Sequence, residues 1–139
     1  MGKSRYEPLV KLKKKSLDEA ERALIAANNE VAGASDRLNR AYQALASLHL
    51  PQSGSIRELS QANMMIQTQH DAIDRCKEML EQAEENQQKM RERFHASRID
   101  FEKFSYLEVQ EVNAQIKKIK AQEAKMLDEI GTITYKREM

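Results

Sequence analysis

The chain has 139 residues, which is enough for one small domain of the usual size of about 100–150 residues. Aromatic residues make up 5% of it, and it holds four glycines, two prolines and no tryptophan. So few rings and turn formers disfavour a sandwich, a barrel or an α/β enzyme and favour long helices. The 23 basic and 22 acidic residues nearly cancel, so net charge alone draws the chain to neither nucleic acid nor an acidic membrane.

The expected compartment follows from cysteine usage and from the lack of long apolar segments. The single cysteine, Cys76, cannot form an internal disulfide, which suits a reducing environment. The first ten residues hold no apolar run of the secretory type, and no stretch of about 18 apolar residues follows. We therefore expect a cytoplasmic protein.

The first predicted helix covers about 6–49, with Pro8 near its start, where proline is tolerated. Apolar residues recur along it every seven residues in two rows, as in a coiled coil. Gly33 interrupts the pattern at a cost of about 1 kcal/mol relative to alanine. One row is large (Val10, Leu17, Leu24, Val31, Leu38, Leu45) and the other mostly alanine (Lys13, Ala20, Ala27, Ala34, Ala41, Leu48).

A tip is predicted at residues 50–55, where proline, glycine and serine gather. Pro51 lacks a backbone N–H and clashes with a preceding helical turn, so a helix is expected to end before it. Ser55 and Glu58 then form a capping-box pattern that predicts the start of a second helix. That helix is expected to cover about 56–131, since Gly131 is a possible stop.

The second helix carries the same two-row seam as the first. Antiparallel pairing fixed at the tip, with Leu48 opposite Leu59, joins residues whose numbers sum to 107. In most pairs of facing residues a large side chain then meets a small one, as at Ala34 and Ile73. This keeps the side-chain volume nearly constant along the seam, as close packing requires. The prediction is an all-α chain of two long helices, the second longer, in one antiparallel coiled-coil hairpin; a parallel dimer is the alternative. The second helix has these rows: Leu59, Ile66, Ile73, Leu80, Gln87, Phe94, Phe101 and Ala62, Gln69, Cys76, Ala83, Met90, Ser97, Phe104.

Beyond Phe104 the second helix is expected to have no partner within the chain for about 30 residues, or roughly 45 Å. An apolar stripe nevertheless continues there, with a break at Glu123. An uncovered stripe of this kind predicts docking to another protein, or pairing with a second copy. The stripe consists of Val109, Val112, Ile116, Ile119, Met126, Ile130 and Ile133.

The sequence offers little for catalysis. It has no phosphate-binding loop, no nucleophile elbow and no clustered metal ligands, and a two-helix chain has no enclosed cleft. We therefore expect a protein that is not an enzyme, with no catalytic residue, no metal and no cofactor. Basic residues gather in residues 1–15, but no aromatic platform accompanies them, so an acidic protein partner or a solvated face is favoured over nucleic acid.

At several positions the sequence resembles the FliJ family of bacterial flagellar type III export. The likeness covers most of the chain and includes its length and hairpin organisation. It is carried by Tyr6-x-x-Leu9-x-x-Leu12 with the basic run toward Ala20 and Leu24, Met65-Ile66-Gln67-Thr68 followed by Ala72-Ile73, Phe101-Glu102-Lys103, and Glu123-Ala124-Lys125-Met126-Leu127-Asp128-Glu129-Ile130.

The resemblance implies a stalk-like coiled coil, similar to the γ subunit of rotary ATPases, that binds and activates a hexameric export ATPase. It implies further docking to the cytoplasmic domain of the membrane export gate and to export chaperones. For the ATPase it points to the stripe Val109, Val112, Ile116, Ile119, Met126 and Ile130. For the gate, the positions that match the family are Tyr42, Met65, Gln69, Ala72 and Cys76.

Other functions remain open at the level of the sequence. The same shape would serve an injectisome relative of the family. A generic coiled-coil scaffold or holdase-like chaperone, self-associating through the C-terminal helix, is the alternative from another class. A nucleic-acid binder using the basic end would show binding that falls steeply with salt.

Overall fold

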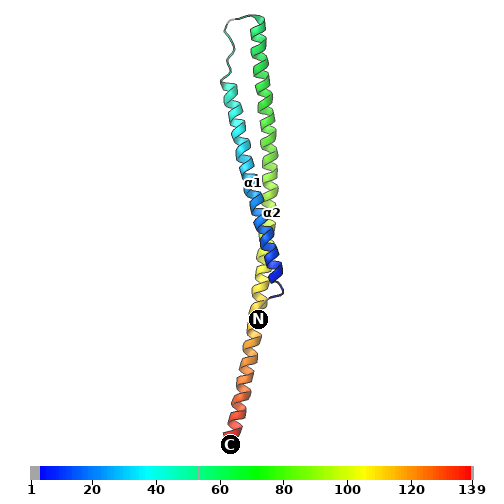
Figure 1. The fold of residues 1–139 in the computed structure, drawn as a ribbon, viewed down its shortest axis with the longest axis vertical. Helices are drawn as coiled ribbons and strands as arrows, with labels where there is room; N and C mark the ends of the chain where they lie inside the picture. Colours follow the sequence, from blue (N-terminus) through cyan, green and yellow to red (C-terminus); the bar gives the residue numbers. More distant parts are fainter. Residues whose placement is uncertain (1–3, 53, 139) are drawn as a thin grey trace. The chain divides into compact units, whose positions relative to one another are not determined.

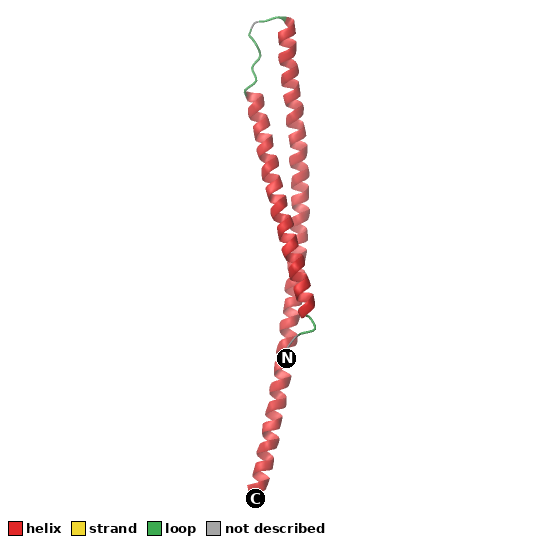
Figure 2. Ribbon diagram, viewed as in Figure 1, coloured by secondary structure: helices red, strands yellow, loops and turns green. Residues whose placement is uncertain are grey.

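The structure, a computed structural model, describes residues 4–52 and 54–138 (Figure 1). Two helices account for nearly all of it: α1 (Glu7–Ala46) and α2 (Ile56–Glu138). Helices and connecting segments make up the whole of these described ranges, without a strand (Figure 2). The predicted all-α hairpin, with its second helix the longer, is confirmed.

By packing, the chain divides into two units, residues 1–18 with 96–139 and residues 19–95. Each unit holds a stretch of α1 against a stretch of α2, and both helices run through both units.

The predicted cap of α2 is present. The Glu58 backbone N–H donates to the Ser55 hydroxyl at 3.2 Å, and the Leu59 N–H donates to the Ser55 carbonyl at 3.1 Å. The first bond satisfies one of the N–H groups that a helix start leaves without partners, and the second is the first bond of the helix itself. Of the predicted tip, Ser53 lies outside the described residues.

Two helix ends differ from the prediction. α1 ends at Ala46, three residues before the expected 49, with the Leu48 N–H bonded back to the Leu45 carbonyl at 3.1 Å. α2 continues through Gly131 to Glu138. A glycine ends a helix when it takes the left-handed conformation, and the Gly131 backbone does not.

The buried apolar side chains all belong to the predicted seam rows. In the unit of residues 19–95, four alanines of α1 are at most 9% exposed and face α2. Small residues let the two helix axes approach, so the α2 side chains meet backbone as well as side chains. The buried set is Leu17, Ala20, Ala27, Ala34, Ala41, Ile73 and Ala83.

The register of the two helices differs from the prediction. The Gln87 amide donates to Asn28 Oδ1 at 2.8 Å, and the numbers of these two residues sum to 115. The Gln69 amide donates to the Ala41 carbonyl at 2.8 Å, a sum of 110. These sums exceed the predicted 107 by 8 and by 3, and Lys13 with Asp100 gives 113. The register that set Ala34 against Ile73 is thus wrong, and the shift is nearest to one heptad.

The connection explains the shift. Residues 47–52 and 54–55 do not form a tight tip, and the described part of this segment runs beside the first turns of α2 (Figure 2). An extended residue advances about 3.3 Å, against 1.5 Å in a helix, so this segment carries the start of α2 past the end of α1. A slip of one heptad keeps the same rows facing each other, which is why the seam was predicted correctly and its register was not.

Gly33 in α1 offers a test of this packing. A Cβ built there lies 3.8 Å from the nearest atom, Nη1 of Arg37, so alanine fits without strain. We expect Gly33→Ala to raise the free energy of unfolding by about 1 kcal/mol, because glycine lowers helix propensity by that amount. Urea unfolding followed by circular dichroism measures it, and a loss of stability would show that α1 is more crowded at this turn.

Candidate binding surfaces

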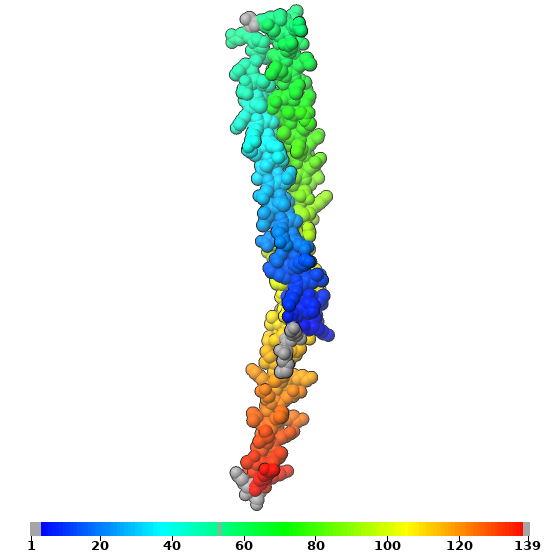
Figure 3. All heavy atoms as spheres, viewed as in Figure 1, coloured from blue at the N-terminus to red at the C-terminus, as the bar shows by residue number. Residues whose placement is uncertain are grey.

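The apolar stripe of residues 109–133 is the uncovered surface predicted from the sequence. Val112 is half-buried, and the other five predicted ATPase-binding residues are 41–60% exposed. In the orange-to-red part of α2, the face seen in Figure 3 has no other segment of the chain over it. The exposed members are Val109, Ile116, Ile119, Met126 and Ile130, and Ile133 extends the row.

The residues just before α1 lie against α2 at Glu111, near the start of the uncovered stripe. The Ser4 hydroxyl donates to Glu111 Oε2 at 2.9 Å, and Arg5 Nε lies 3.6 Å from the same oxygen. Ser4 is only 4% exposed, and its hydroxyl also accepts from the Tyr6 backbone N–H at 3.0 Å. The sequence analysis missed this contact, although Ser4-Arg5-Tyr6-Glu7 has the spacing of a capping box.

Aromatic and charged side chains hold the first turns of α1 against α2. The rings of Tyr6 and Phe104 lie 6.5 Å apart, whereas the predicted register set Tyr6 against Phe101. Lys13 is 3.2 Å from Asp100 and lies over the Phe104 ring at 5.5 Å. Lys14 pairs with Asp18 at 3.2 Å. Much of the basic cluster seen in the sequence is therefore matched by acidic groups of the same unit.

A shallow hollow lies in the middle of the stripe. Glu123, Met126, Leu127 and Ile130 surround about 300 Å³ of open space. Leu127 is 69% exposed and widens the apolar surface at this level. Leu127 was not part of the predicted stripe, because it falls outside the seven-residue rows.

The predicted gate-binding residues all lie in the unit of residues 19–95, but they differ in exposure. Met65 is 59% exposed and Tyr42 is 44% exposed, with Lys77 Nζ 5.9 Å from the Tyr42 ring centroid. Gln69, Ala72 and Cys76 are half-buried, and the Gln69 amide is bonded to the α1 backbone. The exposed part of this surface is therefore Met65 and Tyr42, since Gln69 belongs to the seam.

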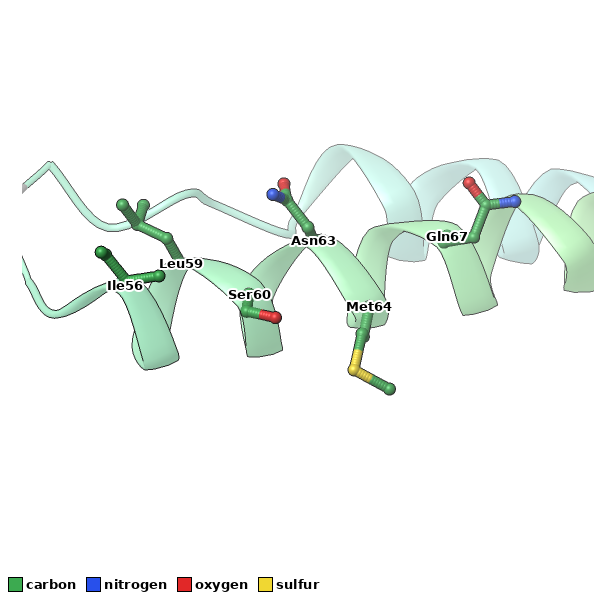
Figure 4. A pocket seen from close by; sticks show the side chains of 6 residues that line it. All are labelled: Ile56, Leu59, Ser60, Asn63, Met64 and Gln67. Carbon is green, nitrogen blue, oxygen red and sulfur yellow. The ribbon is translucent and has the colours of Figure 1, made fainter.

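Near the start of α2 the structure exposes more apolar surface than was predicted. Ile56 is 87% exposed, Met64 is 68% exposed, and both line an open hollow with Leu59 and Asn63. Figure 4 shows Asn63 on the side of the connecting segment and Met64 on the opposite side of the helix. No charged residue occurs between Glu58 and Asp71. This uncharged stretch includes Met65 and Gln69.

The described residues supply no other site chemistry. Among them, no group of three or more histidines, cysteines or acids is placed to hold a metal ion. Cys76 is half-buried. In that same part of the chain, no helix is long and apolar enough to span a membrane.

Comparison with known proteins agrees with this geometry. A family model described as "Flagellar FliJ protein" matches residues 2–139, essentially the whole chain. No match is found among curated proteins or among solved structures.

Proposed function

The chain belongs to the FliJ family, a non-catalytic component of the flagellar export apparatus, and from this premise we propose that it binds and activates the hexameric export ATPase. The observation that carries the proposal is the uncovered stripe of α2. Five of its apolar side chains are 41–60% exposed, a surface that soluble proteins rarely leave without a partner.

Activation follows from mass action. A stalk that contacts several subunits at once binds the assembled ring better than a single subunit, so it shifts the ATPase toward the ring. Only this difference in affinity favours the ring. A stalk that bound the ring and the single subunit equally well would leave the equilibrium between them unchanged. The stripe contributes the apolar contacts, and the exposed Lys117, Lys118 and Lys120 beside it contribute charge.

We assign a second contact, to the cytoplasmic domain of the export gate, to the surface around Tyr42 and Met65. It lies in the unit of residues 19–95, whereas the ATPase stripe belongs to the other unit. Separate surfaces would let one chain hold both partners and so couple the ATPase to the gate. Export chaperones are proposed as further partners, and the chain would be cytoplasmic and peripheral to the inner membrane through these contacts.

The test is ATPase stimulation by a doubly substituted chain, Ile116→Asp with Ile130→Asp. Two carboxylates in the apolar stripe should raise the concentration needed for half-maximal stimulation at least about tenfold, as expected for central interface residues. A matched control, Ala121→Asp with Thr132→Asp, adds the same charge at exposed positions outside the stripe. It should stay within about twofold of the parent chain.

Two readouts separate loss of binding from loss of structure. Circular dichroism should show the same helix content in both variants, since both positions of the stripe are exposed. The stripe variant should also keep its binding to the gate domain, because Tyr42 and Met65 are unchanged. Full stimulation by the stripe variant would overturn the proposal.

A further inference from the structure

We propose that the free protein forms an antiparallel dimer in which the exposed seams of residues 109–133 from two copies pack together. The seam has the two-row spacing of a coiled coil, with one row of residues 109, 116, 123 and 130 and another of 112, 119, 126 and 133. The pairing needs only this chain and does not rest on the proposed function.

Glu123 decides the direction of pairing. It is the one charged residue in the two rows, and it is exposed in the single chain. In a parallel dimer the two Glu123 carboxylates would face each other across an apolar seam, where like charges repel and desolvation adds to the cost. An antiparallel dimer separates them.

Lys120 supplies the partner for this carboxylate. When the two seams pair about residue 121, facing seam residues have numbers that sum to 242, and Glu123 of each copy enters beside Lys120 of the other. The symmetry of the pair makes this contact twice. Within the part of the chain that the structure describes, neither Lys120 nor Glu123 takes part in an ion pair, so both are available.

The apolar residues match in the same register. Ile116 faces Met126, Val112 faces Ile130 and Val109 faces Ile133, and each contact occurs twice. The hollow of about 300 Å³ among Glu123, Met126, Leu127 and Ile130 is bounded by residues at i, i+3, i+4 and i+7. That arrangement is the hole that receives one side chain of a partner helix in a coiled coil, and in this register Ile116 of the second copy enters it.

Charge reversal tests the pairing. Lys120→Glu places two acidic side chains beside each other in the dimer, and Glu123→Lys places two basic ones. Either variant alone should therefore raise the dissociation constant of the dimer roughly tenfold. An equimolar mixture of the two variants should pair, because the carboxylate introduced in one chain would then meet the ammonium group introduced in the other. The chain carrying both changes should recover the parent affinity. Lys118→Glu, which makes the same charge change on the outer face, should not alter it.

Sedimentation equilibrium over a range of concentrations measures the mass, which is 16.0 kDa for one chain. Circular dichroism confirms that each variant remains helical. Disulfide crosslinking reports whether the two helices run antiparallel. In a Cys76→Ser background, a chain with Ile116→Cys should crosslink to a chain with Met126→Cys, whereas two chains with Ile116→Cys should not crosslink. A chain that stays monomeric at about 100 µM, variants that fail to pair when mixed, or efficient crosslinking of Ile116→Cys to itself would each overturn the proposal.

Discussion

Replacing Ala34 with aspartate is expected to lower the free energy of unfolding by about 3–5 kcal/mol, because a carboxylate cannot be solvated there. Ala34 is 2% exposed and lies in the alanine row of α1, against α2. A loss of this size is a large part of the total stability of a small protein.

The matched control is Ala32→Asp, two residues away on the exposed face of the same helix. It introduces the same side chain, so it should cost only about 0.5 kcal/mol through lower helix propensity. Urea unfolding followed by circular dichroism measures both variants. Equal losses at the two positions would contradict the placement of Ala34 in the seam.

Ile73→Ala is expected to lower the free energy of unfolding by about 3–4 kcal/mol, because truncation removes apolar contacts and leaves a cavity that a rigid pair of helices fills poorly. Ile73 is 3% exposed and is the largest of the buried side chains of α2. The same change at Ile56, which is 87% exposed, provides the comparison and should shift stability by no more than about 0.5 kcal/mol. Urea unfolding measures both, and a small effect at Ile73 would show that the seam collapses around the missing atoms.

The helices and their buried faces could be predicted because the signals for them are local. A seven-residue repeat identifies the face that packs, so Ala20, Ala27 and Ile73 were placed correctly in the seam. Pro51 marked the connection between the helices, and the Ser55 cap marked where the second helix starts. Each of these signals depends only on residues close together in the chain.

The register could not be predicted in this way. A shift by one heptad changes which residues meet but leaves every apolar side chain facing the seam, so the pattern fits both arrangements almost equally. The outcome depends on the length and path of residues 47–55, which have no repeat. The contact of Ser4 with Glu111 was missed for a related reason, since it joins residues 107 positions apart.

The predicted binding residues rest on two kinds of signal. The apolar stripe was predicted from periodicity, and its exposed side chains lie near and beyond Glu111, where Ser4, just before α1, contacts α2. The gate residues came from resemblance alone, and Gln69 is bonded to the α1 backbone in place of facing a partner. Local pattern shows which residues are apolar, but only the packed register shows which of them remain uncovered.

The continuity of α2 has a consequence for the energetics of recognition. Starting a helix is unfavourable because several residues must be ordered before the first hydrogen bond forms, whereas lengthening one adds a bond for each residue ordered. In α2 the packed part up to Glu111 supplies that nucleus, and the remaining 27 residues to Glu138 propagate from it. A partner that docks on this part of α2, as we propose, would meet a helix that is already formed, and little of the binding free energy would be lost to ordering its backbone.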